Sequence, residues 1–163
     1  MAQQQTLETL FVETLKDIFY AEKQILKALP KMARSAESPE LKQAFQQHRD
    51  ETEGHVERLQ QIFEMLEKPA RGKTCDAILG IIEEGKEVME EFEGSDALDA
   101  GLTAAAQAVE HYEIARYGTL KTWAMQLGMK DAAALLDQTL QEEKKTDELL
   151  SDLAGQTVNK KAA

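Results

Sequence analysis

The chain has 163 residues, which suffices for one domain with a sizeable core but is short for two. It carries 30 acidic against 19 basic residues, and the net charge of -11 argues against nucleic acid or an anionic membrane surface as its partner. Hydrophobic residues make up 42%, too many for a disordered acidic chain, and no run approaches the ~20 apolar residues of a membrane span.

Nine glycines and three prolines give little turn punctuation, so we expect few and long elements. Apolar residues recur at steps of three and four along the whole chain, which is helical periodicity. The pattern predicts four long helices and a shorter third one, at about residues 5–36, 39–67, 76–93, 96–127 and 130–154. Pro30 falls inside the first helix and either kinks it or ends it early. Residues 156–163 are expected to form a frayed tail.

The lengths of the connections predict the topology. The first and second long helices are joined by a few residues, as are the last two, so each pair is expected to be an antiparallel hairpin. Residues 68–95 between the hairpins are more than a bundle loop needs, and they can carry the chain back along a helix that is about 45 Å long at ~1.5 Å per residue.

The expected fold class is therefore all-α: a ferritin-like four-helix bundle with a short extra helix in the long crossover, in one domain of residues 1–163. A simple up-and-down bundle with a fifth helix is the alternative.

Each apolar stripe is interrupted by polar side chains near the middle of its helix. The interruptions, in chain order, are Glu22, then His48, Thr52 and His55 with Glu51 one step aside, then Glu110 and Glu113, then Glu143 and Asp147. A single such residue is more often a satisfied polar group of the core. Because the midpoints of antiparallel helices lie at one level, four coincident interruptions predict one layer of carboxylates with one or two imidazoles.

Such a layer is unstable alone, because a buried unpaired carboxylate costs several kcal/mol and neighbouring carboxylates repel one another. The lysines and arginines that flank these positions are expected to point outward. Carboxylate oxygens and imidazole nitrogens are ligands of divalent cations, and two such ions balance four negative charges. We infer a dinuclear metal site inside the bundle.

Four segments carry a family resemblance: Tyr20–Gln24, His48–Thr52, Val109–Ala115 and Glu142–Asp147. In them, and from about Leu7 to Lys160 as a whole, the chain resembles the YciF/YciE family of small bacterial ferritin-like proteins associated with stress responses. The resemblance implies a ferritin-like bundle, a homodimer and a di-metal site.

A more distant resemblance to rubrerythrin bears on the ligands. It implies two ions bridged by Glu51 and Glu143, with Glu110 as an extra ligand or proton carrier. The terminal ligands would be Glu22, Glu113 and a histidine.

The sequence departs from the rubrerythrin pattern where Glu-x-x-His is usual. Gly54 follows Glu51 and Thr146 follows Glu143 at that spacing, and neither residue is an imidazole. His48 or His55, one turn either side of Glu51, and Asp147, one turn beyond Glu143, are the available replacements.

The expected function is that of a stress-response protein whose two metal ions react with a small oxidant such as peroxide. The expected metal is iron, with manganese as the alternative. The competing hypothesis is a non-catalytic bundle that sequesters metal or is held together by it, and a metal-free interaction module is a third. The N-terminal residues show no basic segment followed by an apolar one, so we expect a cytoplasmic protein.

Overall fold

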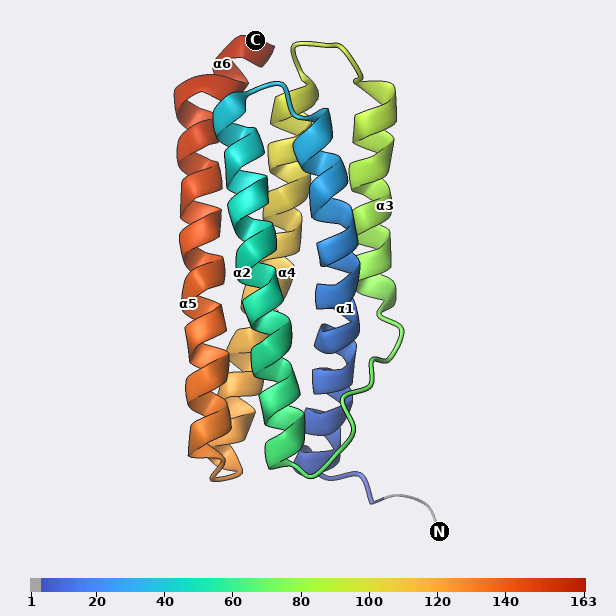
Figure 1. Ribbon diagram of the computed structural model, residues 1–163, viewed down its shortest axis with the longest axis vertical. Helices are drawn as coiled ribbons and strands as arrows, with labels where there is room; N and C mark the ends of the chain where they lie inside the picture. The colour runs from blue at the N-terminus through green and yellow to red at the C-terminus, as the bar shows by residue number, and fades with distance from the viewer. Residues whose placement is uncertain (1–3) are drawn as a thin grey trace.

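The computed structural model describes residues 4–163, and over that range all regular structure is helical (Figure 1). The elements are α1 (Leu7–Ser35), α2 (Pro39–Met65), α3 (Asp76–Glu91), α4 (Leu98–Gln126), α5 (Lys130–Leu153), the π-helical turn η1 (Ala154–Val158) and α6 (Asn159–Ala162). The prediction of an all-α fold is confirmed. None of these helices has an apolar stretch long enough to cross a membrane.

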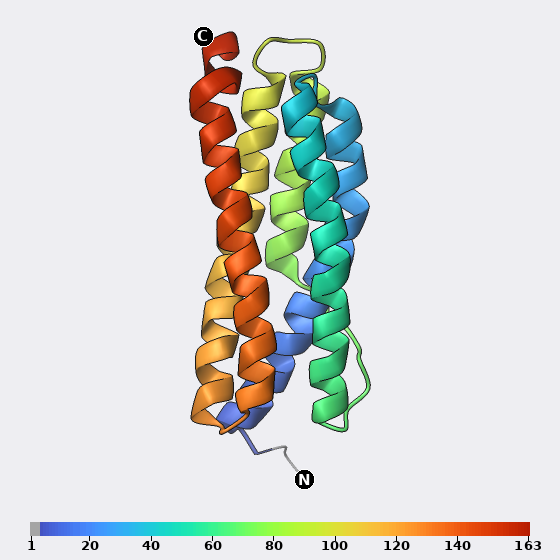
Figure 2. The ribbon, with the colours of Figure 1, turned by 60° about the vertical axis from the view of Figure 1, so that its left-hand side comes forward.

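Four long helices surround a common interior. α1 packs on α2, α2 on α5, α5 on α4, and α4 on α1, while α3 lies outside this ring against α1 and α4 (Figures 1 and 2). α1 and α2 form one antiparallel hairpin, and α4 and α5 form the other (Figure 1). α2 and α4 run in the same direction, because the segment of residues 66–75 and α3 carry the chain back to the opposite end (Figure 1).

The helix ends follow from local chemistry. The Thr6 hydroxyl accepts from the backbone N–H of Thr9 and begins α1, and the Ser38 hydroxyl accepts from that of Leu41 ahead of Pro39 in α2. After α4 the chain turns at Gly128, whose φ of 75° is a conformation that glycine adopts freely. Such caps satisfy backbone groups that a helix end leaves without partners.

Pro30 lies within α1, which continues past it to Ser35. Of the two outcomes considered for this proline, early termination does not occur.

The chain ending differs from the frayed tail expected for residues 156–163. α5 passes directly into η1 and α6, and Gly155 lies inside the π-helical turn rather than closing the helix. The side chain of Val158 is 3% exposed, and the Lys161 ammonium lies 2.7 Å from the Glu37 carboxylate. The buried valine explains why this segment is ordered, because its apolar surface is removed from water against the bundle.

Asp99, in the first turn of α4, ties the two hairpins together. Its buried carboxylate accepts hydrogen bonds from the backbone N–H groups of Glu37 at 2.8 Å and Ser38 at 2.7 Å. These two residues lie in the connection between α1 and α2, so the contact fixes that connection relative to α4.

We predict that Asp99→Ala lowers the free energy of unfolding by about 2–4 kcal/mol, because two charge-assisted hydrogen bonds are lost and their donors stay partly buried. Urea denaturation monitored by circular dichroism measures the effect. Asp96→Ala, at a side chain that is 76% exposed, is the matched control and should change stability by less than about 0.5 kcal/mol. Equal stabilities for the two variants would contradict the role given to Asp99.

Candidate metal centre

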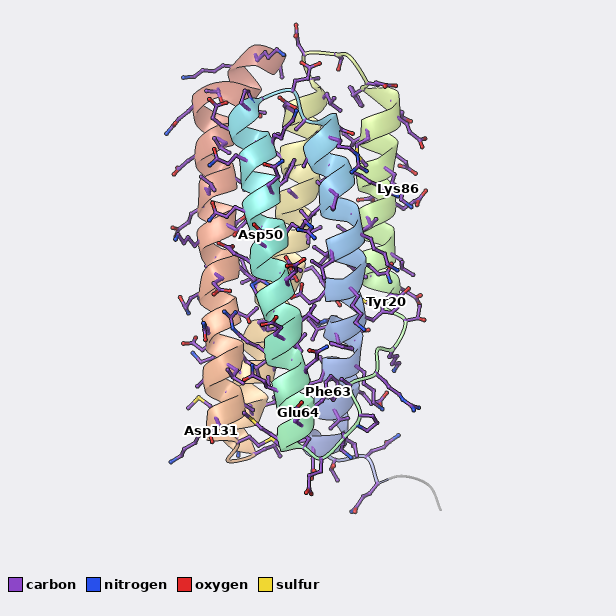
Figure 3. All side chains as sticks on the ribbon, in the orientation of Figure 1. Tyr20, Asp50, Phe63, Glu64, Lys86 and Asp131 are labelled. Carbon is purple, nitrogen blue, oxygen red and sulfur yellow. The ribbon has the colours of Figure 1, made fainter. Side chains whose placement is uncertain are left out.

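Six ionisable side chains meet inside the ring of α1, α2, α4 and α5. Each is at most 3% exposed, and they are Glu22, His48, His55, Glu110, Glu113 and Glu143. Figure 3 shows that side chains fill the space between these helices. All six are among the residues that interrupt the predicted stripes, and both histidines that the sequence offered as alternatives are present.

The six residues form two overlapping groups of potential ligands. One group is Glu22, His55, Glu113 and Glu143, and the other is His48, Glu110, Glu113 and Glu143. Within each group one ligand atom per residue lies within 4.8 Å of all the others. Glu113 and Glu143 belong to both groups, so the arrangement has two shared carboxylates between two halves that each add one imidazole and one carboxylate.

The imidazole nitrogens lie close to carboxylate oxygens without the alignment of hydrogen bonds. His55 Nδ1 lies 2.9 Å from Glu143 Oε1 and 3.4 Å from Glu22 Oε1, and His48 Nε2 lies 2.9 Å from Glu110 Oε1. Among the described residues, nine of the eleven buried side-chain polar atoms that lack a hydrogen-bond partner belong to these six side chains. Buried polar atoms are rarely left unpartnered, so this concentration of free lone pairs fits shared cations.

Two groups outside the cluster orient one half of it. The Tyr117 hydroxyl, fully buried, donates to Glu22 Oε1 at 2.5 Å. His55 Nε2 lies 2.9 Å from Glu142 Oε2, and Arg58 holds both oxygens of that carboxylate at 2.7 Å. Because a carboxylate favours an N–H at Nε2, the pair with Glu142 leaves Nδ1 of the neutral ring free to face the cluster.

The charges of the cluster oppose one another. Burial, followed by the charges of neighbouring glutamates, raises the pKa of Glu113 and Glu143 well above the usual value. Burial is also the main cause that raises the pKa of Glu110 to about 7. Burial disfavours a charge on His55, but the carboxylates of Glu22, Glu142 and Glu143 raise its pKa to about 12. Without a metal, protons and one imidazolium therefore compensate the buried negative charge.

Glu51 lies outside the cluster, contrary to the bridging position expected for it. Its half-buried carboxylate accepts from Gln47 Nε2 at 3.0 Å and from the Thr146 hydroxyl at 3.3 Å. A helix turns about 100° per residue, so Glu51 is displaced by about 60° from His48 around α2. That displacement turns its side chain toward α5, while His48 and His55 take the inward face.

Asp147 also lies outside both groups, contrary to its expected place among the ligands. Its carboxylate lies 3.2 Å from His111 Nε2 and 3.3 Å from Gln107 Nε2, both on α4. The physical reason is reach, because Asp147 stands about 6 Å further along the helix than Glu143 and has a short side chain.

Sequence reasoning missed the contacts of Arg58 and Glu142 with the cluster, and it placed Tyr117 on the inward stripe of α4 without identifying its partner. The contact between Arg58 and Glu142 joins residues 84 positions apart. That between Tyr117 and Glu22 joins residues 95 positions apart. No local spacing signals such pairs.

Residues 6–163 match the family described as "domain of unknown function (DUF892)". The YciF protein of Escherichia coli is 50% identical to the chain over 158 residues, which are 96% of this chain and 95% of the relative. The chain belongs to the DUF892 family. The resemblance to YciF proteins read from the sequence is thereby confirmed.

Solved structures that are similar to this chain have the same architecture. The crystal structure of the E. coli stress protein YciF superposes with a TM-score of 0.91 at 49% identity, over 96% of this chain and 99% of that one. YcfI of Rhodopseudomonas palustris, described as a candidate structural protein, gives 0.89 at 45% identity over 93% and 97%. A protein from Xanthomonas campestris, at 24% identity and a TM-score of 0.75 over 95% and 94%, shares the fold.

The stability of the metal-free protein should fall as pH rises from about 5 to 8. The pKa of Glu110 is about 7 in the folded chain against 4.5 as reference, so between these values the unfolded chain releases a proton that the folded chain keeps. Thermal unfolding after chelator treatment measures the trend. Glu110→Gln should reduce the slope, part of which remains because the pKa values of Glu113, Glu143 and His55 are also raised. Glu53→Gln, at a side chain that is 52% exposed, should leave the slope unchanged. A wild-type melting temperature independent of pH over this range would contradict the charge balance described above.

Proposed function

We propose that this chain is a ferritin-like protein that binds two redox-active metal ions and consumes peroxide at that centre. The metal we propose is iron, with manganese as the alternative. The proposal is carried by one observation: six buried side chains, which together hold nine unpartnered polar atoms, form two groups of potential ligands that share Glu113 and Glu143. The ring of four long helices with a crossover between parallel second and third members supports the ferritin-like description (Figure 1).

The charge of the donor set fits a pair of divalent cations. Four glutamates contribute four negative charges when ionised, and two divalent ions contribute four positive charges. Imidazole and carboxylate donors suit iron and manganese, whereas a site without cysteine is poorly suited to softer ions. Glu113 and Glu143 would be shared by both ions, Glu22 and His55 would hold one, and His48 and Glu110 would hold the other.

Two bound iron ions supply the two electrons that, with two protons, convert hydrogen peroxide into two molecules of water. The chain contributes the surroundings for that chemistry. Its four helices bury the cluster and exclude bulk water. The Tyr117 hydroxyl orients Glu22, and Glu142, held by Arg58, orients the ring of His55. These contacts keep the ligand atoms in place in a medium where buried charges would otherwise repel.

The second candidate function is a bundle that binds metal without catalysis. The cluster is at most 3% exposed and offers four protein ligands in each group, as structural metal sites do. The candidate structural role attached to the R. palustris relative points the same way. Both candidates need the same ligands, so metal content tests the centre and peroxide consumption separates the two. As the sequence implied, we also propose that the chain forms a homodimer.

Metal stoichiometry provides the first test. Wild-type protein reconstituted anaerobically with Fe(II) should retain two ions per chain by elemental analysis, because two groups of four ligands are present. Glu113→Gln should lose at least one ion, since it removes a charged ligand from both groups. Glu51→Gln is the matched control on α2 and should keep both ions, because Glu51 lies outside the groups. Loss of an ion in Glu51→Gln would favour the ligand set expected from rubrerythrin, in which Glu51 is a bridge, and retention of both ions by Glu113→Gln would contradict both ligand sets.

Bound metal should also stabilise the fold. A cation present at 100 times its dissociation constant adds about 2.7 kcal/mol to folding, which raises the melting temperature by on the order of 5–10 °C for a domain of this size. Differential scanning calorimetry with and without Mn(II) measures the shift. Metal that binds without raising the melting temperature would place it outside the folded interior.

Peroxide consumption provides the second test. The iron-loaded wild-type protein should consume hydrogen peroxide in the presence of a reductant, and Glu143→Gln should lower the rate by about 100-fold or more. Glu51→Gln should retain the wild-type rate within about threefold. An inert wild-type protein that binds two ions and melts at a higher temperature would overturn the catalytic function in favour of the second candidate.

A further inference from the structure

A pocket of about 260 Å³ lies between α1, α3 and α4, on the side of the bundle that α3 covers. Its walls are mostly apolar, formed by Ile25, Leu29, Met32, Ile82, Met89 and Val109. Small residues on all three helices (Ala28, Gly85 and Ala105) leave the space open. The exposed Lys27 and Lys86 mark its solvent side, and Figure 3 labels Lys86 on α3.

His48 and Glu110 line the same pocket and are only 3% and 1% exposed. His48 Nδ1 and Glu110 Oε2 have no hydrogen-bond partner among the described residues. Histidines that bind metals generally donate their second ring N–H to an acceptor. His55 has such an acceptor in Glu142, 2.9 Å from Nε2. The Nδ1 atom of His48 has no such acceptor in the described part of the chain, although the Nε2 atom of the same ring lies 2.9 Å from Glu110 Oε1.

We propose that this pocket binds an uncharged aliphatic molecule with a terminal hydroxyl, the chain lying between the helices and the hydroxyl at His48 and Glu110. A hydroxyl accepts one hydrogen bond and donates another, so it completes both unpartnered atoms at once. A carboxylate end is disfavoured there, because it would lie beside Glu110 and next to the remaining glutamates of the cluster.

The size of the pocket sets the length of the chain. A cavity of about 150 Å³ holds the six carbon atoms of benzene, so one of about 260 Å³ accommodates roughly ten non-hydrogen atoms, enough for a chain of eight carbon atoms with its hydroxyl. Water alone is a poor occupant along most of this space, because the walls offer few polar partners.

The same geometry indicates a class of substrate for the metal centre. This extension rests on the proposed function. An alkyl hydroperoxide has the shape of the alcohol with one more oxygen, and that oxygen would lie at the side of the cluster where His48 and Glu110 stand. Its reduction breaks the O–O bond and, with two protons and the two electrons of the metal pair, yields the alcohol and one water.

Binding of 1-octanol to the full-length, metal-free protein tests the pocket without metal chemistry. Isothermal titration calorimetry compares the wild type with Ala28→Leu, which fills the pocket from α1, and with Ile82→Trp, which fills it from α3. Ala108→Leu, at an exposed position of α4, is the matched control. Circular dichroism confirms that each variant retains its helices.

We expect saturable binding to the wild type and to Ala108→Leu, and affinity lowered at least about tenfold in both filled variants. Sodium octanoate should bind the wild type at least about tenfold more weakly than 1-octanol. Absent binding, unchanged affinity in both filled variants, or octanoate bound as tightly as the alcohol would each overturn the proposal.

The hydroperoxide extension is tested with iron-loaded protein. Ala28→Leu should lower kcat/KM for 1-octyl hydroperoxide at least about tenfold while leaving that for hydrogen peroxide unchanged. Equal rates for the variant and the wild type on the octyl compound would overturn the extension. A wild type that consumes neither peroxide refutes the proposed function instead, and leaves the result with 1-octanol standing because that measurement needs no metal.

Discussion

The repulsion between four carboxylates buried at one level is the constraint on which the molecule depends. Glu22, Glu110, Glu113 and Glu143 are at most 1% exposed, and water cannot screen them. Their charge must be compensated by protons, by an imidazolium or by cations. The apolar layers above and below make this choice sharp, because they hold the helices close enough that the carboxylates cannot separate. The aromatic contact of Phe19 with Phe63, at 5.6 Å between ring centroids, belongs to such a layer.

How much of the site the sequence predicts depends on how well periodicity fixes an inward direction. On α1, α4 and α5 the apolar stripe is regular, and Glu22, Glu113 and Glu143 fall at its centre, so their convergence follows from helix geometry. On α2 the polar run is broad, and a helix that packs against both α1 and α5 has two inward-facing edges. The stripe alone cannot decide between Glu51 and the histidines, since about 60° of rotation separates Glu51 from His48.

The lengths of the connections predict the direction of the helices. Contacts between residues far apart in the sequence could not be predicted. The stretch between α2 and α4 is longer than a bundle loop needs, which favours a crossover over a simple up-and-down bundle, and α3 occupies part of it as expected. The carboxylate of Asp99 offers no local signal, because its partners are backbone groups of Glu37 and Ser38. The same holds for the ordered end of the chain, where the burial of Val158 depends on the assembled bundle rather than on the polarity of its neighbours.

The two halves of the cluster have the same ligand types but different surroundings. His55 is held by Glu142, and Arg58 with both its terminal nitrogens secures that carboxylate, so this half is tied to charged groups that lead to the surface. Within residues 4–163, His48 has no such partner, and it borders an apolar pocket instead. In the proposed centre, an ion beside His55 would be fixed in place, whereas an ion beside His48 would adjoin this pocket. This asymmetry supports the proposal that the half with His55 anchors the centre and the half with His48 meets small molecules.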